Sequence, residues 1–105
     1  MIKTWNKIIN NLLTQPRDLP TTPKTTKSPI WFYAYTDGTN IFVEKAKEQM
    51  PSSDITMTRR LTFIEFERVY PIYIKREQGV PVSKEAAYET HNQVYWYSII
   101  KHCTN

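Results

Sequence analysis

The side chains best suited to recognition chemistry lie near the carboxyl end of the chain, where His91, Asn92 and Gln93 are followed closely by Tyr95. Asn and Gln amides can pair bidentately with the edge of an adenine base, which is what direct readout of DNA requires. We expect these residues to approach base edges from the exposed first turn of a helix. The competing interpretation is an ordinary solvated helix face with capping residues at its start.

Basic residues before and after this stretch could supply phosphate contacts. Such contacts position a protein on a duplex without reading its sequence. The chain carries 14 basic and 10 acidic residues, so its net charge is +4, a balance that permits contact with nucleic acid or with an acidic protein surface. The residues expected to contact phosphates are Arg59, Arg60, Lys75, Arg76 and Lys101. Nucleic acid, with duplex DNA favoured, is therefore the leading predicted partner.

Four aromatic side chains in the first half of the chain indicate an alternative binding surface. Trp31, Tyr33 and Tyr35 alternate along one extended stretch, and Phe42 lies on the next. Aromatic residues supply much of the binding energy at protein interfaces. The alternative function is therefore a protein-interaction module, such as an inhibitor or an accessory subunit from a mobile element. A homodimer is compatible with both functions, because helix-turn-helix proteins commonly pair.

Several other kinds of chemistry are not expected. Cys103 is the single cysteine, so neither an intramolecular disulfide nor a cysteine-based zinc site can form. His91 and His102 would lie about three turns apart on one helix, too far to share a metal ion. Two glycines in the whole chain leave no phosphate-cradling loop. We predict a non-enzymatic protein with no metal and no cofactor.

The apolar residues are too dispersed for a membrane span, which needs a run of roughly 18 such residues. The lone cysteine is typical of a reducing compartment. We therefore expect a soluble, cytoplasmic protein that does not contact a membrane.

The first 29 residues are predicted to form a helix and a linker. Apolar residues recur at helical spacing over residues 2–13, which is typical of an amphipathic helix. Residues 14–29 contain four prolines and five threonines and have no such period. That composition predicts a semi-extended linker.

A small antiparallel sheet is predicted next. Residues 30–45 read as a β-hairpin, and the Asp-Gly pair at 37–38 suits a tight turn that needs positive φ. A third strand is expected at residues 54–59, where Ile55 and Met57 alternate with polar residues. Three strands with an apolar face are the minimum for independent stability.

The longest predicted helix begins after a cap at Thr62 and ends at Gly79. Thr62 and Glu65 have the spacing of a capping box. Pro71 removes a backbone donor and predicts a kink. The side chains expected to face the core are Phe66, Val69, Tyr70, Tyr73 and Ile74.

Two shorter helices are predicted after Gly79. Ser83 is a suitable N-cap for a helix through Glu89. Thr90 and Gln93 repeat the capping-box spacing and open a final helix that reaches about His102. The expected buried face of that helix carries Trp96, Ile99, Ile100 and Cys103, and the expected exposed stripe carries His91, Tyr95, Ser98 and His102.

The order of these features resembles small helix-turn-helix modules of restriction-system and mobile-element proteins. The resemblance covers residues 59–103, although the turn lacks a glycine and the final helix lacks an arginine. It is carried by Arg59, Arg60, Phe63, Phe66, Tyr70, Lys75, Arg76, Gly79, Asn92, Tyr95, Ile99 and Ile100. The resemblance implies DNA binding through the final helix.

We therefore predict one α+β domain over residues 1–105. It has an N-terminal helix, a small antiparallel sheet built on a β-hairpin over residues 30–58, and a helical C-terminal half over residues 59–105 with a helix-turn-helix-like tail.

Overall fold

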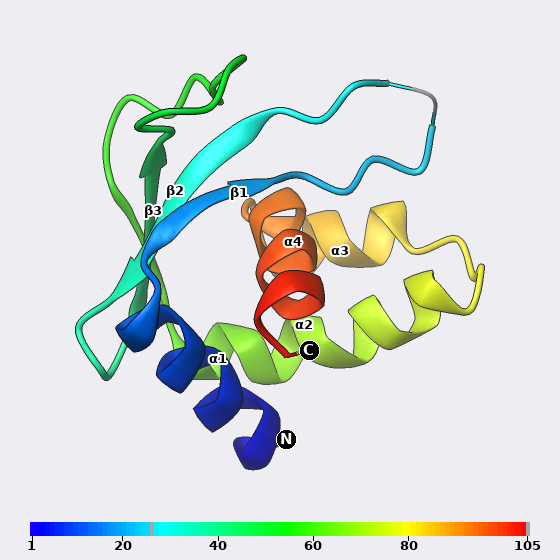
Figure 1. The fold of residues 1–105 in the computed structure, drawn as a ribbon. Helices are drawn as coiled ribbons and strands as arrows, with labels where there is room; N and C mark the ends of the chain where they lie inside the picture. Colours follow the sequence, from blue (N-terminus) through cyan, green and yellow to red (C-terminus); the bar gives the residue numbers. More distant parts are fainter. Residues whose placement is uncertain (26, 105) are drawn as a thin grey trace.

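The computed structural model describes residues 1–25 and 27–104 and confirms the α+β fold. Four antiparallel strands lie in the sheet in chain order, and the helices gather on one side of it (Figure 1). The elements are α1 (Ile2–Thr14), β1 (Arg17–Pro20), β2 (Trp31–Thr36), β3 (Ile41–Lys45), β4 (Arg59–Leu61), α2 (Phe63–Glu77), α3 (Ser83–Glu89) and α4 (Gln93–Cys103).

Strand alternation decides which side chains enter the core. Successive residues of a strand point to opposite faces, and Phe32 and Ala34 of β2 are fully buried on the side of the helices. Ile41 and Val43 of β3 are buried with them, because the β2–β3 register places Ala34 opposite Val43. The intervening residues of both strands are turned to the other face.

Helix α4 lies at the centre of the helical layer. Its Trp96 is fully buried and packs against Phe66 of α2, with ring centroids 5.7 Å apart. Trp5 of α1 approaches the same two rings at 5.3 and 6.3 Å. Aromatic pairs in this range add about 0.5–1.5 kcal/mol beyond their area of burial. Three helices distant in sequence are therefore joined through one aromatic cluster.

Glu65 ties the start of α2 to the beginning of α4. The Thr62 hydroxyl accepts a hydrogen bond from the Glu65 backbone N–H at 3.3 Å, so half of the predicted capping box is present. The Glu65 carboxylate instead accepts hydrogen bonds from Trp96 Nε1 at 2.5 Å and Thr90 Oγ1 at 2.6 Å. It therefore serves a tertiary contact in place of a helix cap.

The predicted linker and third strand are placed differently in the structure. β1 lies inside the predicted linker and pairs with β2, so that Leu19 is buried opposite Phe32. Residues 54–58 are irregular, and β4 begins only at Arg59. The β2–β3 loop lies between the paired residues Thr36 and Ile41, and Gly38 has the positive φ that was expected of this turn. Pairing between distant segments overrode the local patterns.

The helix predictions need smaller corrections. On α2, Ile72 is buried and the predicted core residue Ile74 is 38% exposed, although Phe66 and Val69 are buried as expected. Ser83 is the first residue of α3 and makes no cap hydrogen bond. The Thr90 hydroxyl accepts from the backbone N–H of Asn92, so the second capping box does not form. The predicted helix continues across Pro71 as expected, and the kink stays a prediction.

Candidate functional site

The structure contradicts the predicted exposure of Tyr95. Its side chain is only 7% exposed. The phenol oxygen is 2.7 Å from Ser53 Oγ, and the ring lies edge-on to Phe32 with centroids 4.9 Å apart. Ser98 of the same expected stripe is also buried and donates to the carbonyl of Pro20. Tyr95 cannot reach a base edge, because it lies between α4 and the sheet.

The remaining residues of the predicted readout surface are only partly available. Within α4, only Val94 and Lys101 are exposed. Asn92 accepts a hydrogen bond from Arg59 at 3.1 Å and donates one to Glu65 at 3.4 Å. His91 is exposed before the helix begins. A recognition helix must present a face to the major groove, and α4 is mostly covered.

The basic residues predicted to contact phosphates do not form one patch. Arg59 and Arg60 precede α2, whereas Lys75 and Arg76 lie in its last turn. A helix of 15 residues rises about 1.5 Å per residue, so the two pairs are roughly 20 Å apart. Lys75 forms an ion pair with Glu85 at 3.2 Å. The residues predicted to contact phosphates are therefore scattered, which weakens the DNA-binding hypothesis.

The face of the sheet turned away from the helices carries the four residues predicted as protein-binding anchors. Trp31, Tyr33 and Tyr35 of β2 and Phe42 of β3 alternate with buried neighbours, so they share this face. All four are partly exposed. Tyr35 is opposite Phe42 in the strand register, and the rings stack with centroids 5.3 Å apart. We call these four residues the aromatic face.

Charges of both signs surround the aromatic face. Lys47 Nζ lies 4.5 Å from the centre of the Tyr33 ring and 3.7 Å from the Glu44 carboxylate. Asp18 of β1 and Arg60 of β4 occupy register positions on the same side of the sheet. The two cations and two carboxylates balance, so this surface has no positive excess.

Two shallow hollows of about 410 and 350 Å³ flank the Tyr33 ring. Lys47 lines both of them. The first hollow extends past Tyr35 to Leu13 at the end of α1, and the second is bounded by Asp18. The two hollows therefore share the Tyr33 ring and the Lys47 side chain that lies over it.

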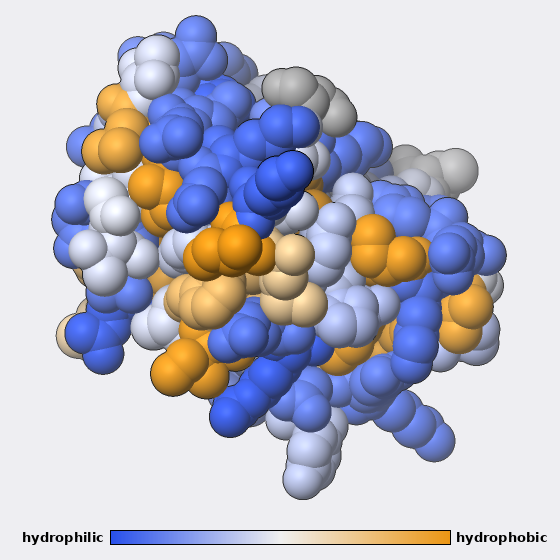
Figure 2. Space-filling view, turned by 90° about the horizontal axis from the view of Figure 1, so that it is seen from below, coloured by the Kyte–Doolittle hydropathy of each residue, from blue (hydrophilic) through white to orange (hydrophobic). Residues whose placement is uncertain are grey.

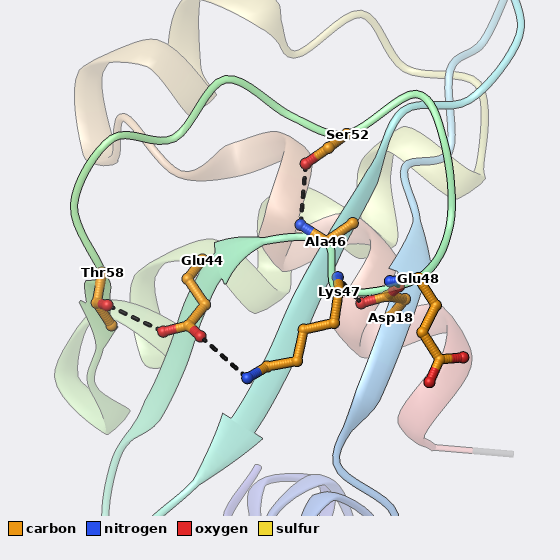
Figure 3. A network of polar contacts seen from close by, with 7 residues as sticks. All are labelled: Asp18, Glu44, Ala46, Lys47, Glu48, Ser52 and Thr58. Carbon is orange, nitrogen blue, oxygen red and sulfur yellow. Dashed lines mark hydrogen bonds and ion pairs between the residues drawn. The ribbon is translucent and has the colours of Figure 1, made fainter.

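Figure 3 shows how the loop that carries Lys47 is fastened to the sheet. The Asp18 carboxylate accepts hydrogen bonds from the backbone N–H groups of Lys47, Glu48 and Gln49 at 2.9, 2.7 and 2.8 Å. Partial burial raises the pKa of Asp18, but these three donors outweigh it and hold the pKa below its ordinary value. The ionised carboxylate therefore anchors this loop beside the aromatic face.

Sequence reasoning missed Asp18 and Lys47 as members of the site. Asp18 lay in the predicted linker, and Lys47 is 29 positions further along the chain. The single apolar residue Leu19, between Asp18 and Pro20, is the weak signal that β1 offered. The pairing of β1 with β2 is what brings the carboxylate to this loop.

A second hydrophobic surface lies on α1 and α2. Ile2 and Leu13 of α1 and Ile64 of α2 are more than half exposed. Figure 2 shows hydrophobic side chains gathered near the middle of the face seen from below, where these helices lie. Polar residues interrupt this surface, and Leu13 at its end also borders the first hollow beside Tyr35.

Metal chemistry finds no support in residues 1–25 and 27–104. No group of three His, Cys, Asp or Glu side chains there could hold an ion. Cys103 is buried, which raises its pKa to about 11. Burial lowers the pKa of His102, and Lys101 and Arg17 lower it further. None of the described helices is long and apolar enough to span a bilayer.

The chain matches no protein-family model, and comparisons with curated proteins and with solved structures find no significant similarity. Its function must therefore be argued from the geometry of the surfaces described above.

Proposed function

We propose that the protein is a non-enzymatic protein-binding module that engages its partner through the aromatic face. The observation that carries this proposal is the grouping of Trp31, Tyr33, Tyr35 and Phe42 on the sheet face opposite the helices, with every ring partly exposed. Large amphipathic rings on a rigid sheet bury much area while losing little conformational entropy.

The charge pattern favours a protein over a nucleic acid as the partner. Single-stranded nucleic acids also stack on aromatic side chains, but their phosphates require a positively charged groove. Here Lys47 and Arg60 are offset by Glu44 and Asp18. A hydrophobic centre with a mixed polar rim is the usual anatomy of a protein interface.

The position of Lys47 suggests the chemistry of the partner. Its ammonium is held between the π face of Tyr33 and the Glu44 carboxylate. If Lys47 moved aside, a lysine or arginine of a partner could occupy the same position. The Tyr33 ring and the Glu44 carboxylate would attract that cation as they attract Lys47. We therefore expect the partner to present a basic side chain beside an apolar patch.

Site-specific photocrosslinking in the producing cells would test the proposal. A benzophenone amino acid at Phe42 should give a discrete crosslinked protein, whereas the same group at Tyr88 should not. Tyr88 is a suitable control, because it is 87% exposed and lies on α3. Tyr35→Ser should remove the crosslink by deleting the ring of the aromatic face that lies opposite position 42. A crosslink to a second copy of the chain would identify the partner as a homodimer mate.

The predicted binding of duplex DNA can be measured on the same preparations. Micromolar affinity that falls steeply with added salt would indicate phosphate contacts. If Arg59→Gln with Arg60→Gln abolished that binding while Phe42 gave no discrete crosslink, the DNA hypothesis would replace this proposal.

A further inference from the structure

A separate cleft of about 740 Å³ lies between the segment that joins β1 to β2 and the helical layer. In Figure 1 residues 21–25 of this segment pass above α3 and α4. The cleft is lined mainly by apolar surface, to which Val82, Ala86, Val94 and Tyr97 contribute. Clefts of this size and character are typical of sites for small molecules.

Two reciprocal hydrogen bonds hold residues 21–24, which we call the strap, against the end of α2. Arg76 Nη2 donates to the carbonyl of Thr22 at 2.6 Å, and Lys24 Nζ donates to the carbonyl of Arg76 at 2.7 Å. The Arg76 guanidinium also lies 4.3 Å from the centre of the Tyr97 ring. Two cationic groups are thus placed at one side of the cleft by the strap, α2 and α4.

These two cations have no acidic partner in the part of the chain that is described. Neither Arg76 nor Lys24 lies within 4.0 Å of a carboxylate there, whereas the neighbouring Lys75 is paired with Glu85. A guanidinium has five N–H donors, and the Thr22 carbonyl uses one of them. The half-buried Arg76 therefore keeps donors and charge for a ligand. Asp54 is the acidic side chain in the lining.

We propose that this cleft binds a small organic anion with an apolar body. Its carboxylate pairs with Arg76 and Lys24, and its body lies against Tyr97, Ala86 and Val94. Arginine is suited to the first role because its planar fork matches the two oxygens of a carboxylate. The proposal does not depend on the aromatic face, which is on the other side of the sheet.

Titration with 2-naphthoate tests the proposal, because 2-naphthamide has nearly the same shape and no charge. We expect naphthoate to bind with an affinity at least tenfold higher than that of naphthamide. A tenfold ratio corresponds to about 1.4 kcal/mol of binding free energy. Amide NMR shifts should localise the ligand to Ala86, Val94 and Tyr97. Equal affinity for the acid and the amide, or shifts confined to another surface, would overturn the proposal.

Two variants separate anion binding from a purely structural role of Arg76. Arg76→Gln should weaken naphthoate at least tenfold and leave naphthamide unchanged. Val94→Asp places a negative charge, of the same sign as naphthoate, in the lining of the cleft. Position 94 is exposed, so this change should also weaken naphthoate binding without unfolding the protein. Lys75→Gln is the matched control, because it removes an adjacent charge outside the lining and should leave the affinity unchanged. Naphthoate affinity that survives both Arg76→Gln and Val94→Asp in folded protein would refute the site.

Discussion

Replacing Glu65 with alanine should strongly destabilise the fold, because this carboxylate connects α2 to α4. Its oxygen Oε1 accepts hydrogen bonds from Trp96 Nε1 at 2.5 Å, Thr90 Oγ1 at 2.6 Å and Asn92 Nδ2 at 3.4 Å. Trp96 is fully buried and Thr90 is 6% exposed. In Glu65→Ala these donors would lose their acceptor on α2.

The expected loss follows from the two short bonds. A hydrogen bond to a charged group contributes about 1.5–3 kcal/mol to stability, so the loss of two such bonds in Glu65→Ala should lower the free energy of unfolding by about 3–6 kcal/mol. A domain of this kind has about 5–15 kcal/mol in total. Glu65→Gln keeps one acceptor oxygen without the charge, and we expect it to cost about 1–2 kcal/mol.

Urea unfolding followed by far-ultraviolet circular dichroism measures these differences. Glu67→Ala is the matched control, because Glu67 is exposed on the same helix and should change stability by less than about 0.5 kcal/mol. If Glu65→Ala costs no more than Glu67→Ala, then the carboxylate does not hold α4 to α2 and the argument from these hydrogen bonds is wrong.

Three further predictions concern other parts of the chain. The pKa of Asp18 is lowered in the folded protein, so the ionised carboxylate should stabilise the fold at pH values above its ordinary pKa of 3.8. This stabilisation should be lost as the pH falls through the pKa of the folded state. Urea midpoints measured from pH 6 to pH 2 should show the loss, and Asp18→Asn should make it smaller. Pro71 is exposed inside α2, so Pro71→Ala should restore a helical N–H donor and raise the free energy of unfolding by about 1 kcal/mol or more. A lower free energy of unfolding would mean that the proline ring stabilises the helix. Cys103 is buried and its pKa is raised to about 11, so a thiol reagent at pH 8 should modify it only after urea unfolds the protein. Rapid modification without urea would show that the C-terminal end of α4 opens easily.

The sequence predicted the elements whose patterns are local and strong. α1 extends over Ile2–Thr14 where residues 2–13 were expected, and β2 and β3 form the predicted hairpin. The buried face of α4 was also identified correctly at Trp96 and Ile99. In each case the period of the apolar residues is enough to identify the element.

The same reasoning failed where burial depends on a distant segment. Arg17–Pro20 has almost no strand signal, and it becomes β1 because β2 offers a pairing edge and the core has room for Leu19. Tyr95 was expected to be exposed because the helical period of the apolar residues identifies only one buried face on a helix. In the structure, α4 is covered by the sheet on one side and by α1 and α2 on others. Its second face therefore also enters the core.

The sequence by itself determined the fold class, the hairpin and the set of aromatic and charged side chains available for binding. The tertiary structure alone decided how these side chains are distributed. It separates Arg59 and Arg60 from Lys75 and Arg76 by the length of α2, and it leaves the aromatic face partly open because all the helices pack on the other side of the sheet. Local periodicity indicates that a face is apolar, but the choice between core and surface depends on which segments meet it when the chain folds.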